Sequence, residues 1–280
     1  MSGQAIAEPE RAMDRYDLYE LCVQRAAAVV PFLRAIHGGS ARRLAEDFCG
    51  TAAVSREWVR SDTSGVASAI GMDLDTGVLD WARAKAAAEG LGRIELVHGD
   101  VLSATDRITA DGAAAGDGMD VVFVGNFSIG EIHERSELVG YLRWCRERLR
   151  PGGVVVIDTY GGASAWRVGA SRRAHQAGPG VRVLYTWEQR EGDPYSGRVE
   201  CALHFDVERG GEVVERYPEV FLYRWRLWSV PELRDAMREV GLSHTSVHAD
   251  LETGTLRETA GKTVEGEGFI VCVAGRAEGV

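Results

Sequence analysis

Acidic side chains and one tight turn recur where buried strands of this chain should end. The segment Glu46-Asp47-Phe48-Cys49-Gly50 closes the first such strand, Asp73 closes the second, and Asp100 follows the third. In an open parallel sheet the carboxyl ends of the strands lie at one edge, beside the point where strand order reverses. We therefore expect one shared site. A carboxylate at Asp73 is placed to accept hydrogen bonds from two ribose hydroxyls, and Asp100 is placed near an adenine amine.

The turn after the first strand distinguishes two cofactors that contain an adenosyl group. A dinucleotide site needs Gly-x-Gly-x-x-Gly, so that a helix N-terminus can hold the pyrophosphate. Here the turn Phe48-Cys49-Gly50-Thr51-Ala52 has a single glycine. The carboxylates of Glu46 and Asp47 repel a diphosphate but tolerate a sulfonium and an ammonium. Charge thus favours S-adenosylmethionine over a nicotinamide dinucleotide.

Apolar strands alternate with amphipathic helices over the first half of the chain, which predicts a parallel sheet covered by helices on both faces. The expected strands are Arg43–Phe48, Ala67–Asp73, Arg93–His98, Met119–Gly125 and Val154–Asp158, and the expected helices are Ala52–Arg60, Thr76–Glu89 and Glu134–Arg148. Apolar spacing from Asp14 to His37 predicts a further helix, which Pro31 should kink or split.

The character of the chain changes after Gly161-Gly162. From there on, residue types alternate with a period of two and are rich in β-branched and aromatic side chains. This pattern predicts an antiparallel meander with a hairpin turn at Gly210-Gly211. Ser229 begins the next helix, with Glu232 three residues on. The expected meander strands are Val181–Arg190, Arg198–Glu208 and Glu212–Trp228, and His244–Asp250 and Gly268–Ala274 should complete the sheet. The predicted fold is α/β, with a doubly wound, mostly parallel seven-stranded sheet and an inserted antiparallel β meander.

Four short motifs carry a resemblance to a known family over residues ~43–160. They are Glu46-Asp47-Phe48-Cys49-Gly50-Thr51-Ala52, Gly71-Met72-Asp73-Leu74-Asp75, Gly99-Asp100-Val101 and Leu149-Arg150-Pro151-Gly152-Gly153. In this combination the chain resembles the class I S-adenosylmethionine-dependent methyltransferases. The family commonly has glycine where this chain has Phe48 and Ala52. The Asn/Asp-Pro-Pro-Tyr/Phe signature of base-amine methyltransferases does not follow the fourth strand.

The resemblance implies roles for individual residues. Glu46 matches the acid ending strand one, and Gly50 matches the glycine that approaches the methionine part of the cofactor. Asp73 would bind ribose, and Asp100 and Val101 would line the adenine. The candidate cofactor-binding residues are Tyr16, Tyr19, Glu46, Asp47, Phe48, Gly50, Asp73, Leu74, Asp100, Val101, Asn126 and Phe127.

Several of these residues also have a structural interpretation. Glu46 or Asp47 can form a hydrogen bond with the N-terminal helix, and Asp100 can accept hydrogen bonds from the backbone amides of its own turn. Asp75 is the better candidate for the helix cap. Tyr16 and Tyr19 share a helical face, and they either close a lid over the cofactor or pack ordinarily.

Catalytic and acceptor-binding residues are expected after strand four and in the meander. Asn126 would lie beside the transferred methyl, and Glu131 or His133 would serve as a general base unless they are exposed helix-start residues. Phe221, Tyr223 and Trp225 share one strand face and are expected to pack. The opposite face either binds an anionic acceptor group through its arginines or is solvated. The candidate acceptor-binding residues are Tyr160, Tyr185, Trp187, Arg224, Arg226 and Trp228.

Composition limits the partners of the 280-residue chain. Acidic residues outnumber basic ones 42 to 32, giving a net charge of −10, and no basic tract is present, which disfavours nucleic acid. No apolar run approaches the ~18 residues that span a bilayer. The five cysteines are scattered, which suits reduced thiols and the cytoplasm. No ligand pairs suggest a metal site.

We therefore expect one domain over residues 1–280, with a helical lid at 1–40 and a substrate cap at 163–228, as a monomer or homodimer. The expected function is methyl transfer from S-adenosylmethionine to a small molecule by in-line displacement. The alternatives are a nicotinamide-dependent oxidoreductase on a similar sheet and a non-catalytic adenosyl-binding or interaction protein.

Overall fold

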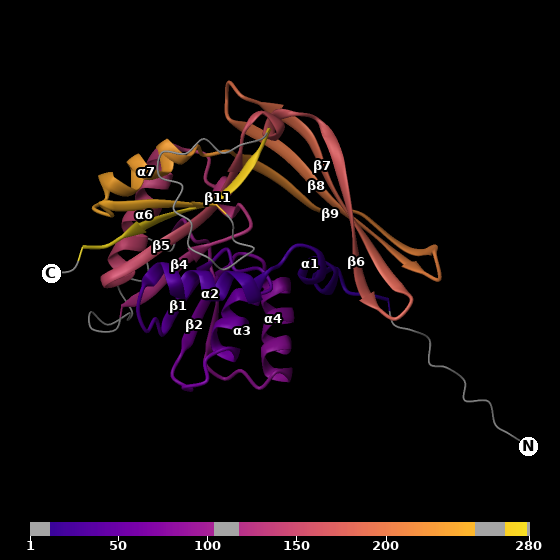
Figure 1. Cartoon of the computed structure of the whole chain (residues 1–280), viewed down its shortest axis with the longest axis horizontal. Coiled ribbons are helices and arrows are strands. Elements are labelled where there is room, and N and C mark those ends of the chain that lie inside the picture. The colour runs from indigo at the N-terminus through magenta and orange to yellow at the C-terminus, as the bar shows by residue number, and fades with distance from the viewer. Residues whose placement is uncertain (1–11, 104–117, 250–266, 279–280) are drawn as a thin grey trace, which may run out of the picture.

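The computed structural model describes residues 12–103, 118–249 and 267–278 (Figure 1). Its main body is a seven-stranded sheet, sheet A, in which β1 to β5 run parallel and β11 runs antiparallel to both of its neighbours. In spatial order the strands are β10 (His244–Ala249), β11 (Phe269–Arg276), β5 (Leu149–Gly161), β4 (Met119–Val124), β1 (Arg43–Asp47), β2 (Ser68–Asp73) and β3 (Ile94–His98). The predicted fold class is confirmed. Strand order reverses between β1 and β4, where a ligand site is expected.

Helices cover both faces of sheet A because its strands are apolar on both sides. One face packs against α2 (Ala26–His37), α3 (Ala53–Arg60) and α4 (Thr76–Ala88), and the other packs against α6 (Arg135–Arg148) and α7 (Val230–Glu239) (Figure 1). The predicted start of α7 is confirmed, because Ser229 and Glu232 form a reciprocal capping box.

The inserted segment forms a second sheet, sheet B, with strands in chain order and antiparallel pairing. Its elements are η3 (Ala163–Trp166), β6 (Gly169–Gly178), β7 (Val181–Asp193), β8 (Arg198–Arg209) and β9 (Glu212–Arg226). The meander strands and the Gly210-Gly211 turn are confirmed. Strand β6 is a correction to the expected three-stranded meander. It is an exposed edge strand, so it lacks the apolar alternation that reveals a half-buried strand.

The N-terminal segment differs from the single helix that its spacing predicts. Helix α1 (Arg15–Cys22) ends before α2 begins at Ala26, and Pro31 lies inside α2 instead of at the break. The two helices also have different partners. Helix α1 contacts β6 and β7 of sheet B, whereas α2 packs on sheet A. The predicted lid at 1–40 therefore divides into a bridging helix and a core helix, and residues 1–11 lie outside the described residues.

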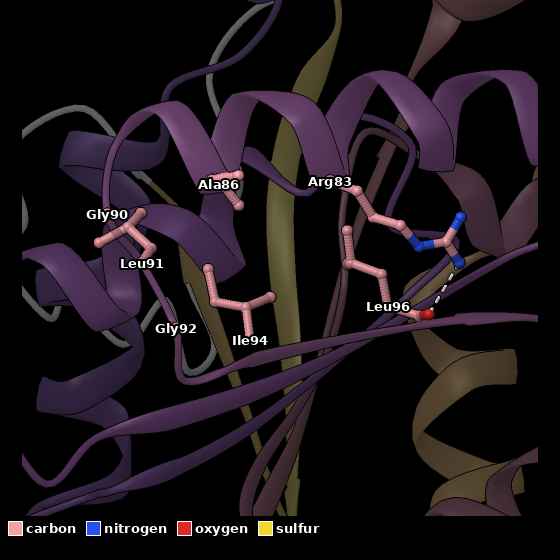
Figure 2. A pocket seen from close by; sticks show the side chains of 8 residues that line it. Arg83, Ala86, Gly90, Leu91, Gly92, Ile94 and Leu96 are labelled. Carbon is pink, nitrogen blue, oxygen red and sulfur yellow. Dashed lines mark hydrogen bonds between the residues drawn. The ribbon is translucent and has the colours of Figure 1, made fainter.

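A hollow of about 480 Å³ opens between α4 and the edge strand β3 (Figure 2). Its lining includes Ala86, Leu91 and Ile94, together with Arg83, whose guanidinium donates to the Leu96 carbonyl at 3.0 Å. Helix α4 begins beside Asp73 and ends beside Gly90, so the Gly90–Gly92 part of the hollow lies at the far end of the helix from Asp73. Its lining includes no carboxylate, and we do not include it in the candidate site.

Candidate active site

The turn between β1 and α3 follows an unusual backbone path. Phe48, Gly50 and Ala52 have φ angles of +54°, +51° and +54°, in the left-handed region that glycine adopts most easily. The chain thus keeps a glycine-type turn with phenylalanine and alanine at two of its positions. Open space surrounds the position where a Cβ on Gly50 would lie, so nearby protein atoms leave room for a ligand beside its backbone.

The carboxylate of Asp73 connects this turn to the end of β2. Its Oδ2 accepts from the Gly50 amide at 2.7 Å, and its Oδ1 accepts from the Asp75 amide at 3.0 Å. Asp73 does not cap α4. Asp75 does, because its carboxylate accepts from the amides of Gly77 and Val78. The structure thus assigns the cap to Asp75 and leaves Asp73 partly exposed at the strand end.

The two acids that end β1 have structural partners. Glu46 is buried, and its Oε2 accepts from the Ser55 amide at 2.7 Å, so it occupies the N-terminus of α3. Burial raises the pKa of Glu46 to about 7, although hydrogen bonds from Ser55 and Val54 oppose the shift. Asp47 is 1% exposed; it accepts from the Tyr141 hydroxyl at 2.7 Å and pairs with Arg148. Asp47 therefore belongs to the core beneath α6, a correction to its predicted contact with the cofactor.

The end of β3 is followed by Asp100 and Val101, and the end of β2 is followed by Leu74. Asp100 accepts from the Leu102 amide at 2.9 Å and from the Ser103 hydroxyl at 2.8 Å, which is the turn role that was left open. Leu74 is 65% exposed at the end of β2, an accessible apolar surface next to Asp73. Val101 is 3% exposed within the main core, so its side chain packs there instead of offering a surface.

A buried carboxylate fixes the turn after β4. Asp158, near the end of β5, accepts from the amides of Asn126 and Phe127 at 2.8 and 2.7 Å. Both of those residues have positive φ angles, +55° and +64°. Burial raises the pKa of Asp158 to about 7, against the opposing effect of the two amides. Sequence reasoning placed Asp158 at a strand end but gave it no role, because nothing local marks its partners 31 and 32 residues away.

Helix α1 brings two tyrosines to this region. The ring of Tyr16 lies 5.8 Å from that of Trp81 on α4, and the ring of Tyr19 lies 4.9 Å from that of Phe221 on β9. Burial raises the pKa of Tyr19 to about 12; a hydrogen bond from Tyr223 opposes this, and the charges of Asp158 and Asp73 add to it. Tyr19 therefore lies within electrostatic range of the ends of both β2 and β5, where the expected cofactor site is.

Four rings, which we call the aromatic wall, lie next to one another above the turn after β4. They are Tyr160, Trp187, Tyr223 and Trp225. The Tyr223 and Trp225 rings stack at 4.3 Å, Trp187 and Trp225 lie 5.9 Å apart, and Tyr160 and Trp187 lie 6.2 Å apart. Phe127 contacts the wall through Tyr160, at 4.7 Å. Tyr185 lies farther along β7, against Phe205.

Glu131 and His133 differ in accessibility for proton transfer. The indole of Trp225 donates to Glu131 Oε1 at 2.7 Å, and Glu131 remains exposed to solvent. Surrounding protein raises the pKa of Glu131, and the charge of Asp73 adds to the rise, although the Trp225 hydrogen bond and His133 oppose it. His133 instead lies against the Arg224 carbonyl through Nε2 at 2.8 Å and against Arg198 through Nδ1 at 3.3 Å. With both ring nitrogens engaged, His133 is not placed to act as the predicted base.

The side chains on the predicted acceptor face of β9 have other partners in the structure. Arg224 is exposed and pairs with Glu200 at 2.9 Å. Arg226 donates to the His133 carbonyl at 2.8 Å and lies 3.7 Å from the centre of the Trp228 ring. Trp228 is 1% exposed in the main core. The other face, predicted to pack, carries Tyr223 and Trp225 toward α1 and Glu131.

Two searches of the described residues bear on partners. Across residues 12–103, 118–249 and 267–278, each helix is too short or too polar to cross a membrane. The same ranges hold no group of three or more His, Cys, Asp or Glu side chains suited to a metal ion.

The sheet order, the antiparallel β11 between β5 and β10, and the strand-end site define a Rossmann-like methyltransferase fold. Residues 46–153 match the family described as a methyltransferase domain. The match agrees with the prediction of a methyltransferase, and the shared fold agrees with the predicted class I architecture. No curated protein sequence matched the chain.

Solved structures share the fold across nearly the whole chain. An S-adenosylmethionine-dependent methyltransferase from Clostridium acetobutylicum is 15% identical, with a TM-score of 0.66 and coverage of 94% of this chain and 98% of that one. DesVI from Streptomyces venezuelae is 19% identical, with a TM-score of 0.66 and coverage of 95% and 100%. An amino pentose methyltransferase from Micromonospora echinaspora, solved with its cofactor bound, is 16% identical, with a TM-score of 0.64 and coverage of 95% and 99%.

Proposed function

We propose that this protein transfers the methyl group of S-adenosylmethionine to a small-molecule acceptor held between sheet A and sheet B. The observation that carries the proposal is the link from Asp73 to the Gly50 amide, which joins two strand ends at the point where strand order reverses. The proposal is supported by structural neighbours described as a sugar N-methyltransferase and an amino pentose methyltransferase, whose acceptors are small.

The residues at the strand ends fit the cofactor. Asp73 offers a partly exposed carboxylate for ribose hydroxyls, Leu74 offers an exposed apolar surface for the adenine, and Gly50 leaves open space beside its backbone. Bound there, the cofactor supplies an activated methyl group on a positively charged sulfur. The protein contributes alignment and exclusion of water, and alignment alone can be worth ~7–11 kcal/mol.

The aromatic wall and α1 provide that exclusion of water. Tyr16 packs on α4 beside the cap of that helix, and Tyr19 interacts with the Tyr223 hydroxyl from the opposite side. Helix α1 is held by ion pairs of Asp17 with Lys85 and of Glu20 with Arg56. We propose that α1, not all of residues 1–40, covers the cofactor, and that the 163–228 insertion forms the acceptor cap.

The oxidoreductase alternative conflicts with the N-terminus of α3. A dinucleotide phosphate would need the helix amides there, and the buried Glu46 carboxylate already accepts from one of them. A second anion at this position would meet direct repulsion. We further propose a cytoplasmic location, supported by the five cysteines, all of which are free.

Two measurements test the proposal. Calorimetry should show that S-adenosylmethionine and its demethylated product bind, while NADH does not. Incubation with methyl-labelled S-adenosylmethionine and a metabolite extract should then give a labelled small molecule. Absence of cofactor binding up to about millimolar concentration would refute the proposal, and binding without any labelled product would favour the non-catalytic alternative. Labelling of RNA or DNA alone would refute the small-molecule acceptor.

A further inference from the structure

The carboxylate of Glu131 lies at the end of the aromatic wall, and the neighbouring backbone at Gly130 makes room for this arrangement. The Trp225 indole reaches Glu131 at 2.7 Å because it lies directly against Gly130. A Cβ at Gly130 would come within 2.7 Å of the Trp225 side chain, so any larger residue there would push the indole away. The wall and Glu131 therefore form one unit, assembled from β5, β7, β9 and η2 (Ser128–Glu131).

The charged groups that act on this unit are mainly negative. Tyr19 on α1 experiences the charges of Asp158 and Asp73, and Glu131 experiences those of Asp73 and His133. The further ionisable groups facing Tyr223 are the phenols of Tyr19 and Tyr185. His133 is the one basic group among those interactions of the described residues, and both of its ring nitrogens are engaged.

Such surroundings select the charge of an acceptor. Ring faces attract cations, and a carboxylate beside them forms strong hydrogen bonds with an ammonium. An anionic acceptor at the wall would instead approach like charges, because Arg224 and Arg226 are committed on the outer side of β9. Arg173 acts on Tyr185, which lies farther along β7 and outside the wall.

We propose that the acceptor presents a primary or secondary aliphatic amine, bound as an ammonium against the aromatic wall, and that Glu131 removes its proton. This inference rests on the proposed methyl transfer. An ammonium nitrogen has no lone pair, so one N–H bond must break before the nitrogen can form a bond to carbon. The electron pair of that bond stays on nitrogen, and the proton bonds to a Glu131 oxygen, from which water removes it. When that pair forms the new nitrogen–carbon bond, the bond between the methyl carbon and sulfur would break and its electron pair would stay on sulfur, which leaves as the neutral demethylated product. The raised pKa of Glu131 makes it a better proton acceptor than an ordinary glutamate.

The test compares probes that differ only in their polar group. With the demethylated cofactor product present at saturation, cyclohexylamine, cyclohexanol and cyclohexanecarboxylate are titrated at about pH 8, where the amine is protonated. We expect cyclohexylamine to bind at least about tenfold more tightly than cyclohexanol, and the carboxylate to bind most weakly. Glu131→Gln keeps an oxygen for the Trp225 indole and removes the charge, so it should reduce the preference to the part that the rings supply, without changing cyclohexanol binding.

A matched control separates local charge from net charge. Glu200→Gln makes the same change beside Arg224 on the outer face, and it should leave all three affinities within about twofold. Equal binding of amine and alcohol by the unmodified protein, or no detectable amine binding up to its solubility limit, overturns the inference. An unchanged preference in Glu131→Gln overturns the role of Glu131. If the demethylated product itself fails to bind, the proposed function fails and the inference fails with it.

Discussion

Asp73 and Asp75 lie two residues apart, and their carboxylates accept hydrogen bonds from different backbone amides. The Asp73 carboxylate accepts from the amides of Gly50 and Asp75, and we assign its exposed edge to ribose. Asp75 accepts from the amides of Gly77 and Val78 in the first turn of α4. We therefore expect Asp73→Ala to weaken binding of S-adenosylmethionine about 10- to 100-fold, since a hydrogen bond to a charged group is worth ~1.5–3 kcal/mol.

The same variant should also lose some stability, because two backbone amides lose their acceptor. At ~0.5–1.5 kcal/mol for each bond the loss is ~1–3 kcal/mol. Asp75→Ala removes only a helix cap, which costs ~0.5–2 kcal/mol. The two variants should thus have similar melting temperatures, each lowered by about 2 °C per kcal/mol for a chain of this length. Their cofactor affinities should differ strongly, with Asp75→Ala within about twofold of the parent.

Calorimetric titration and thermal unfolding without ligand measure the two effects separately. Asp73→Asn adds a further check, because it keeps one oxygen acceptor for the turn but lacks the negative charge. Equal losses of affinity in the alanine variants at positions 73 and 75 would show that helix α4, and not the Asp73 carboxylate, controls binding. Unchanged affinity in Asp73→Ala would refute the ribose assignment.

Three further outcomes follow from buried or strained groups. Arg148→Met should lower the free energy of unfolding, measured in urea, by ~3–5 kcal/mol, because it leaves the buried Asp47 carboxylate without its cationic partner. Arg143→Met, on the exposed side of α6, should change this free energy little. Equal effects of the two variants would contradict the argument for a buried ion pair. Ala52→Gly should be neutral or up to ~1 kcal/mol stabilising, because Ala52 has a φ of +54°, which glycine adopts more easily. Ala84→Gly, inside α4, should instead destabilise the protein by ~0.5–1 kcal/mol. Equal destabilisation by both variants would refute backbone strain at Ala52. Glu46 and Asp158 have pKa values of about 7 in the folded protein, raised from ~4 in an unfolded chain. Between pH ~4 and ~7 the folded protein therefore binds more protons than the unfolded chain. The contribution of these two carboxyl groups to stability falls as pH rises through that range. Melting curves at about pH 5.5 and pH 8 should show this difference, and Glu46→Gln should reduce it; a variant with the full pH dependence would contradict the assignment to Glu46.

Much of the fold could be predicted because its signals are local. Apolar strands, amphipathic helices and the capping box at Ser229 each occupy a short stretch of sequence, and outside the N-terminal segment they were found where they were expected. The strand-end rule then grouped Asp73, Gly50 and Asp100 before any contact was known. Strand β6 was missed because an exposed edge strand has no buried face to impose a period of two.

The partners of the buried acids could not be predicted, because they depend on contacts between distant segments. Asp47 looks like a cofactor ligand beside Glu46, yet Tyr141 and Arg148 on α6 meet it from 94 and 101 residues away. The sequence offers a signal only in retrospect. Tyr141 and Arg148 are seven residues apart, two helical turns, so they share one side of α6 and can reach a single carboxylate.

The two faces of β9 show the same limit and its consequence for the acceptor. Alternation establishes that Tyr223 and Trp225 share one face and that Arg224 and Arg226 share the other, but it does not say which face meets sheet A. Contacts outside the strand decide this. Tyr19 meets Tyr223, and Gly130 admits the Trp225 indole beside Glu131, so the aromatic face turns toward the strand ends. The proposed acceptor site is then lined by rings and Glu131, with Arg224 and Arg226 on the opposite face of the strand, and for this reason we propose an amine instead of an anion as the acceptor.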